Sequence, residues 1–486
     1  MALWPQGKTL CASGAIVLLV GSSVVKSGQA IQIIGRLMIV SAALAVYALA
    51  LHWAYVNLIT DRFAYLGYTY SEPALETAAL TYGSAVLAAW VLPARLSRPS
   101  DLILWILFIV AVAPSILVPI YTDYQPATGS WLSGLYFASA FMLAALIARR
   151  NSSQPMRPLI KSMSPKVFWL VVGAYTALVY ALLHFTLGLS LNFVGLLDVY
   201  DQREEYRQGL AGTTALVGYL VSTQANVVNP LIIAGGLARR QWTVVALGVL
   251  GQAVLYSGTG FKTILFSVPT IVLIALLMRG GRRPRTIWLL WGGVVLIAAA
   301  AIVDQLQGDI LWTSLFTRRF LLTPGVLTAA YLEFYSYNPF AMLSYSVLEG
   351  FTRDHYGTPP ARVIGYMLTE NPNTAANANF FADGYANFGF TGVAAAAVIL
   401  GVYLRVLDRA SDGLPVGVTV LIVVMPAVAL SNTSILTAML SHGLVAAVAL
   451  LALAPRSDRA WNPSGAHSLQ YRRYKSPRSW HAGAYI

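Results

Sequence analysis

Hydrophobic residues in this chain gather in long runs separated by short polar segments. Most runs are about twenty residues long, the length an α-helix needs to cross a bilayer. Inside lipid the backbone groups must pair within the segment, so we expect these runs to be helices. The pattern predicts an all-α polytopic membrane protein with about 12–14 transmembrane helices. The predicted spans are roughly 9–25, 31–59, 74–92, 101–120, 131–148, 166–188, 210–238, 241–257, 262–278, 286–303, 389–407, 415–431 and 434–454.

One long interval, 304–388, interrupts the apolar runs and is too polar to be a plain span. Within it, Thr323 and Pro324 predict a helix start, with threonine as N-cap and proline in the first helical position. A second short helix is expected from Asn338-Pro339 to near Gly350. Both helices would be apolar on one side and too short to span, which is typical of helices lying in the membrane interface.

The domain organisation follows from these runs. We interpret residues 1–486 as a single membrane-embedded domain, without a convincing internal repeat. The interval 304–388 is expected to form an external loop, a lid that lies on the bilayer. Residues 455–486 are expected to form a basic cytoplasmic tail.

Composition agrees with a membrane protein. The chain is 57% hydrophobic and 10% charged, whereas soluble proteins carry about 25% charged residues. The net charge of +13 does not indicate nucleic-acid binding, because most cations lie in short loops between spans and in the C-terminal tail. The single cysteine, Cys11, excludes an internal disulfide and a cysteine-built metal site.

The positions of the cations predict the orientation. Arginine and lysine cluster in alternate loops, and such loops face the cytoplasm by the positive-inside rule. The opposite loops, including 304–388, are then external, and the count of spans gives an external N-terminus and a cytoplasmic C-terminus. The residues that mark the cytoplasmic side are Arg95, Arg98, Arg149, Arg150, Arg157, Lys161, Lys166, Arg239, Arg240, Arg279, Arg282, Arg283, Arg285, Arg405 and Arg409.

The external cations are nearly all arginine, against the topological trend. Arginine pairs two oxygens of a phosphate or carboxylate through a planar, permanently charged fork, whereas lysine is a point charge. This preference indicates an anionic ligand such as a diphosphate. The candidate pyrophosphate-binding residues are Arg203, Arg207, Arg318, Arg319, Arg353, Arg362 and Lys262.

Each of these groups also has a plainer interpretation. The polar cluster from Asp198 to Arg207 is either a solvated loop of salt bridges or an anion clamp, with Arg203 and Arg207 on one helix face. Arg318 and Arg319 either anchor lipid headgroups or bind the ligand. His355 lies beside arginines and is either structural, a general base or a phosphate ligand.

An asparagine- and aromatic-rich run, 371–389, precedes the next span. It is either an aromatic belt at the membrane surface or a sugar-binding segment. In the second interpretation Asn377, Asn379 and Asp383 bind hydroxyl groups, while aromatic rings such as Tyr385 stack on sugars.

Two other functions are disfavoured. Gly258 to Thr263 looks like a phosphate loop but lacks a lysine directly after its second glycine and a preceding strand, so it fails as a nucleotide site. Lys262 within it remains a candidate anion ligand. Charged residues inside the spans are too few for a proton or ion relay, which lowers the case for a coupled transporter.

Several of these features together resemble one known family. They are about a dozen spans with one large external loop late in the chain, the stretch from Arg318-Arg319 through Pro324-Gly325 to Phe334, and the run from Asn377 to Gly389. Arg207 followed by Gly218 is also similar to a pattern of arginine, ten residues and glycine, although the other external arginines do not repeat it. The chain therefore resembles the Wzy-type family, the polymerases of O-antigen and capsule repeat units.

The resemblance implies a fold like that of C-type glycosyltransferases in the bacterial inner membrane, with the active site on the periplasmic face. It implies that a growing glycan on undecaprenyl pyrophosphate is transferred to the hydroxyl of a lipid-linked repeat unit, without a metal or other cofactor. The implied partners are these lipid-linked oligosaccharides, membrane lipids and a protein that sets chain length.

In that reaction arginines would stabilise the pyrophosphate leaving group, and a base would take the acceptor proton. The candidate catalytic residues are His355, Asp198, Asp201 and Asp383. Two alternatives stay open: an O-antigen ligase, which uses the same donor with a different acceptor, and a flippase of lipid-linked oligosaccharides.

Overall fold

The computed structural model describes residues 11–149, 160–187, 215–279, 282–345, 352 and 354–461, with side chains from residue 30 onward except at 187, 215, 458 and 459. Five candidate site residues lie outside these residues, namely Asp198, Asp201, Arg203, Arg207 and Arg353. Most of the predicted tail, from residue 462, lies outside them as well.

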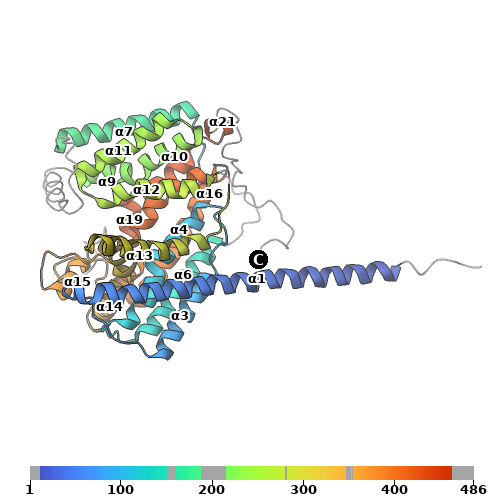
Figure 1. The fold of residues 1–486 in the computed structure, drawn as a ribbon. Coiled ribbons are helices and arrows are strands. Elements are labelled where there is room, and N and C mark those ends of the chain that lie inside the picture. Colours follow the sequence, from blue (N-terminus) through green and yellow to red (C-terminus); the bar gives the residue numbers. More distant parts are fainter. Residues whose placement is uncertain are drawn as a thin grey trace, which may run out of the picture.

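The described chain is all helical and contains no β-strand (Figure 1). Several spans join α-helical segments through short π-helical or 3-10 turns, labelled η. The elements are α1(Cys11–Ala54), η1(Tyr55–Ile59), α2(Thr60–Phe63), η2(Ala64–Leu66), α3(Leu75–Trp90), α4(Pro99–Leu107), η3(Phe108–Val112), α5(Ala113–Leu117), η4(Pro119–Tyr121), α6(Ser130–Arg149), α7(Pro165–Leu187), α9(Ala215–Thr223), η5(Gln224–Val228), α10(Asn229–Arg239), α11(Trp242–Thr259), α12(Lys262–Leu277), α13(Ile287–Gln307), η7(Thr313–Leu322), α14(Thr323–Tyr337), α15(Pro360–Thr369), α16(Phe380–Ala410), α17(Val416–Ile422), α18(Val424–Ala429), α19(Ile435–Ser441), α20(Leu444–Leu453) and α21(Asp458–Trp461).

Helix length and hydropathy make this a multi-pass membrane protein. Among the described residues, 8 helices are long and apolar enough to cross a membrane, or 9 if the bent pair α19 and α20 forms one span. The expected count of about 12–14 was therefore too high for this part of the chain. The difference arises partly because α12 and the α17–α18 pair are apolar but shorter than a standard span.

The predicted first hairpin is wrong. Segments 9–25 and 31–59 were expected to be separate spans, but α1 continues without a break from Cys11 to Ala54. The intervening Lys26-Ser27-Gly28-Gln29 does not end the helix, since one glycine inside a helix costs only about 1 kcal/mol. A helix of 44 residues is about 66 Å long, twice the thickness of the hydrocarbon core, and α1 projects from the bundle in Figure 1.

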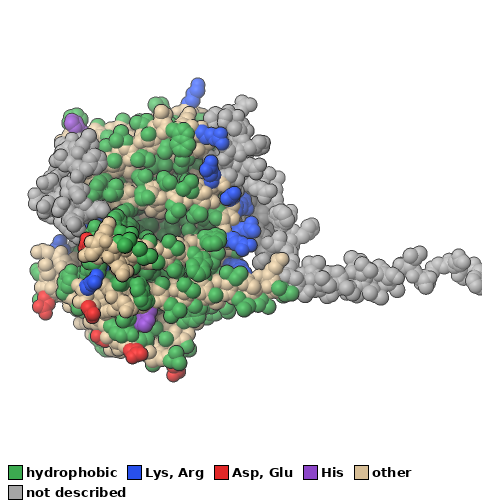
Figure 2. All heavy atoms as spheres, viewed as in Figure 1, with side chains coloured by type: hydrophobic (Ala, Val, Ile, Leu, Met, Phe, Trp, Pro, Cys, Tyr) green, Lys and Arg blue, Asp and Glu red, His purple; other side chains and the backbone are tan. Residues whose placement is uncertain are grey.

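Charge separates the two ends of the bundle. Figure 2 shows lysine and arginine gathered on the side from which α1 projects, while aspartate and glutamate lie mainly on the opposite side. We call the first side the basic end. There, arginine side chains donate hydrogen bonds to loop carbonyls, as Arg36 does to Leu92 and Arg149 to Val91. The Cys11 end of α1 lies on the same side (Figure 1). The expected external N-terminus depended on two spans in this region, and it stays a prediction.

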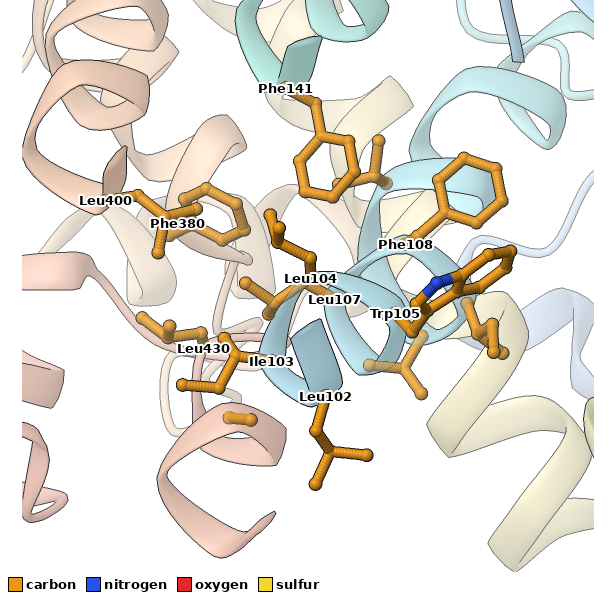
Figure 3. Packing of buried hydrophobic residues seen from close by; sticks show 14 of the residues in the cluster. Leu102, Ile103, Leu104, Trp105, Leu107, Phe108, Phe141, Phe380, Leu400 and Leu430 are labelled. Carbon is orange, nitrogen blue, oxygen red and sulfur yellow. The ribbon is translucent and has the colours of Figure 1, made fainter. Parts of the chain in front are cut away.

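The centre of the bundle is the span built from α4, η3 and α5, of which 89% of the most apolar window is buried. Its aromatic and aliphatic side chains pack against α6 and α16, where Phe108 stacks on Phe141 and where Phe380 and Leu400 belong to the same cluster (Figure 3). A helix that is surrounded by other helices on all sides has to be apolar around its whole circumference. The run from Leu102 to Leu117 meets that requirement.

Part of the interval 304–388, which was expected to form a lid, packs inside the helical bundle. The helix predicted at Thr323 exists as α14, but Pro324 to Leu332 are buried, and α14 packs against α5 and α16. The second predicted helix is wrong over its described part, because Asn338 to Tyr345 is not helical. A short amphipathic helix does occur later, as α15, with Ile364 buried and Tyr366 exposed.

Candidate functional site

The α16 helix reverses direction within the run predicted to bind sugar. Phe388 (φ −147°, ψ 24°) and Gly389 (φ 61°, ψ −147°) are non-helical. A Cβ atom on Gly392 would lie 1.9 Å from the carbonyl oxygen of Gly384, so the two arms pack backbone to backbone. A positive φ at the tip favours glycine because other residues have a clashing Cβ there. Residues 380–387 therefore form a short arm folded against the long arm that runs to the basic end.

Asn379 begins this short arm and has a structural role. Its side-chain oxygen accepts hydrogen bonds from the backbone of Phe381 and Ala382, as an N-cap does. Its amide nitrogen donates to Ser115 Oγ (3.0 Å) and Thr328 Oγ1 (2.9 Å), on α5 and α14. With 1% exposure, Asn379 cannot reach a sugar without unfolding this joint, so we leave it out of the site.

Replacing Asn379 with alanine should lower the stability of the joint by about 3 kcal/mol, since it removes an N-cap and two buried hydrogen bonds. Asn379→Ser keeps an N-cap oxygen and should lose clearly less. The apparent unfolding midpoint of the detergent-purified protein measures both. Equal midpoints for wild type and Asn379→Ala would contradict this role.

Asp383 lies one turn along the short arm from Asn379. Its carboxylate is half-buried and has no hydrogen-bond or ion-pair partner among the described residues. Burial raises the pKa of Tyr331, and the negative charges of Tyr335 and Asp383 add to that shift. The hydroxyl of Tyr335 is itself buried without a partner. A carboxylate without a partner can accept a hydrogen bond or a proton from a ligand.

Hydrogen bonds from the turn after α14 hold the end of the short arm of α16 in place. The Leu343 backbone donates to the side chain of Asn387 (2.7 Å), and the Ala341 backbone donates to Ala386. Tyr385 is buried, with its hydroxyl 3.2 Å from Ser336 Oγ on α14. Tyr385 therefore connects the short arm of α16 to α14. Its ring is not exposed for stacking on a sugar.

Arg318 and Arg319 lie in η7, just before α14. The Arg318 guanidinium carbon is 4.2 Å from the centre of the Phe63 ring and 6.0 Å from that of Tyr68. It also donates to Ser314 Oγ (2.8 Å). Burial raises the pKa of Tyr68, and the Arg318 charge opposes that shift. The aromatic side chains of the first connection therefore hold Arg318, a contact that the sequence did not indicate.

Arg319 is exposed beside this pair, and no described residue pairs with its guanidinium. Of the two adjacent arginines, one is thus held by aromatic rings and the other is open to solvent or lipid headgroups. Adjacent residues point to different sides of a helix, which explains the difference.

The remaining described candidates are His355, Arg362, Asn377 and Lys262. His355 is exposed, with its ring 6.4 Å from that of Tyr356. Asp354 next to it accepts hydrogen bonds from the Tyr356 backbone and from the Tyr345 hydroxyl, which lower its pKa. Arg362 on α15 and Asn377 are exposed, and Lys262 is half-buried at the start of α12.

The structure therefore brings together only some of the predicted residues. Asp383 and Tyr385 share the short arm of α16, and Arg318 and Arg319 share η7, with α14 between the two groups. No described arginine forms an ion pair with Asp383. Phe63, Tyr68, Tyr331 and Tyr335 belong to these surroundings but were not predicted. The density of aromatic residues at 63–70 and 331–337 was the available signal.

Comparison with known proteins identifies no relative: no family model, no curated protein and no solved structure matches the chain. The helices and their apolar lengths define a class, that of multi-pass helical membrane proteins.

Proposed function

We propose that the protein polymerises lipid-linked oligosaccharide repeat units, transferring a growing glycan from its polyprenyl pyrophosphate to the hydroxyl of an incoming unit. The observation that carries this proposal is the unpaired carboxylate of Asp383 on a folded-back helix arm. The exposed Arg319 in η7, on the other side of α14, supports it, because the reaction needs both a base and a cation for diphosphate.

The expected orientation suits this reaction. If the basic end faces the cytoplasm, then the α16 tip, whose long arm ends there with Arg409, faces the other side of the membrane. Sugar transfer on that side has to use a donor that carries its own leaving group. A lipid pyrophosphate meets this need.

The proposed step balances as a single displacement. The acceptor hydroxyl oxygen forms a bond to the anomeric carbon of the donor, and the bond from that carbon to the pyrophosphate oxygen breaks with its electron pair. Asp383 takes the hydroxyl proton, and arginine N–H groups stabilise the charge that develops on the pyrophosphate. Arg319 supplies this stabilisation, and Arg203, Arg207, Arg353 and Arg362 stay in the proposal as further ligands.

Arg319→Gln tests the diphosphate part of the proposal. It should reduce polymer formation by about 10²–10³-fold, the usual cost of removing one group that stabilises transition-state charge. The protein should fold normally, because the Arg319 side chain is exposed and unpaired. Polymer length and yield from purified lipid-linked units provide the measurement.

The matched control is Arg95→Gln, which removes an exposed arginine at the basic end and should leave polymer formation unchanged. Wild-type polymer from Arg319→Gln would exclude Arg319 from the site. Transfer to a lipid A-core acceptor, with no polymer from repeat units, would instead identify a ligase.

A further inference from the structure

A groove of about 480 Å³ lies between α7, α10 and α11, away from the site described above. One helical stripe of α7 forms its first wall, from Trp169 through Gly173 to Tyr180, and α11 forms another, from Val244 to Val254. Leu247 and Leu250 on this wall are 65% and 57% exposed, so the groove opens sideways, toward the lipid around these spans.

The length of the groove matches one leaflet. Trp169 and Tyr180 lie eleven residues apart on α7, which is about 16 Å along a helix. The hydrocarbon core is about 30 Å thick, so the groove extends for about half of it. Its inner end is closed by polar side chains that bond to one another, with Asn229 Nδ2 donating to Gln252 Oε1 (3.1 Å) and to the Tyr180 hydroxyl (3.1 Å).

Hydrogen-bond donors without acceptors lie next to the Trp169 end of the groove, which we call its outer end. Trp169 lines the groove, and Arg239 packs against the Trp169 ring. The Arg239 guanidinium carbon lies 4.0 Å from the centre of the Trp169 ring. Arg239 Nε, Arg239 Nη2 and Trp169 Nε1 are all buried and have no hydrogen-bond partner. An unpaired buried donor is costly, so three at one place indicate a missing acceptor. A Cβ on Gly235 would lie 2.6 Å from the Trp169 ring, which shows how closely the pair is held.

This end of the groove belongs to the basic end of the bundle. Just before α7, the Met163 backbone donates to the Leu453 carbonyl (2.9 Å), and Arg456 beyond it donates to Ala410 (2.7 Å). The groove therefore runs from the surface of the leaflet at the basic end to the middle of the membrane.

We propose that this groove binds an anionic phospholipid of the leaflet at the basic end. One acyl chain lies along the α7 stripe, and phosphate oxygens accept hydrogen bonds from Arg239 and Trp169 Nε1. Charge selects an anionic lipid over a zwitterionic one, because the unpaired donors belong to a permanent cation. Basic pockets between spans bind such headgroups in other membrane proteins.

The test uses the purified full-length protein, stripped of lipid in detergent and then mixed with phosphatidylglycerol or phosphatidylcholine of the same acyl composition. Native mass spectrometry counts the lipid that stays bound. Wild type should retain phosphatidylglycerol about tenfold more strongly than phosphatidylcholine, the ratio expected from one charge-assisted contact. Arg239→Gln should remove this preference, and Arg239→Lys should keep part of it.

Gly173→Leu tests the apolar part of the groove. A Cβ on Gly173 meets nothing within 4 Å, so a larger side chain fills the groove without a clash and should abolish retention of both lipids. Gly292→Leu is the matched control, a substitution on α13 where the added Cβ also meets nothing within 4 Å. Together with Arg95→Gln, it should bind lipid as wild type does.

Three results would overturn the proposal. The first is an unchanged lipid preference in Arg239→Gln, and the second is wild-type lipid retention by Gly173→Leu. The third is a dimer without bound lipid, which would indicate that a helix of a second copy occupies the groove. None of these measurements depends on transferase activity, so they stand or fall separately from the proposed function.

Discussion

Asp383→Asn should reduce polymer formation by about 10²–10⁴-fold, the range for removing a general base. The substitution keeps the size of the side chain and removes only its charge and basicity. It should leave the protein folded, because the Asp383 carboxylate forms no hydrogen bond or ion pair that the variant would lose. The initial rate of polymer formation by purified protein, compared with the unfolding midpoint, separates the two effects.

Asp123→Asn is the matched control for this substitution. Asp123 is exposed in the connection between η4 and α6, next to Tyr124, whose hydroxyl bonds to Gly67. The Asp123→Asn variant should form polymer at the wild-type rate. If Asp383→Asn also polymerised at that rate, the base would have to be sought elsewhere, with His355 the next described candidate.

Gly392→Ala should destabilise the protein and stop polymer formation, because it separates the two arms of α16. The added Cβ would lie 1.9 Å from the Gly384 carbonyl oxygen, and the atom in its way belongs to backbone, which cannot rotate aside. Overpacking of this kind costs about 1–3 kcal/mol. A loss of stability would be informative, because replacing glycine with alanine inside a helix is otherwise stabilising by about 1 kcal/mol.

Gly292→Ala shows the opposite case. That glycine lies inside α13, and its added Cβ meets nothing within 4 Å, so the variant should be as stable as wild type or slightly more stable. A stable, active Gly392→Ala variant would show that polymer formation does not need the close packing of the two arms. It would also show that the fixed position of Asp383 is not needed.

The sequence predicted the membrane class and the separation of charge, because both depend on local runs that lipid and orientation enforce. It did not predict the ends of several elements. A polar interruption such as Lys26-Ser27-Gly28-Gln29 fits a turn and a helix equally well, and α1 is continuous there. The helix at Thr323 was placed correctly, but its burial depends on α5 and α16, which are distant in sequence.

The site was only partly predictable for the same reason. Asp383 was identified as a candidate from its residue type and its position ahead of a span, whereas Asn379 was assigned to sugar binding although the structure makes it an N-cap. A capping signal was present, since asparagine directly precedes the helical run from Phe380. The contacts of Arg318 with Phe63 and Tyr68 join segments more than 240 residues apart, so no local pattern indicates them.

One measurement tests the central claim most directly. Purified protein is incubated with lipid-linked oligosaccharide repeat units alone, and the products are sized on a gel. The proposal predicts a ladder whose steps are one repeat unit, absent with Asp383→Asn and with Arg319→Gln and present with Asp123→Asn. A ladder of wild-type intensity from both site variants, or single units that stay unchanged with wild-type protein whose fold is intact, would contradict it.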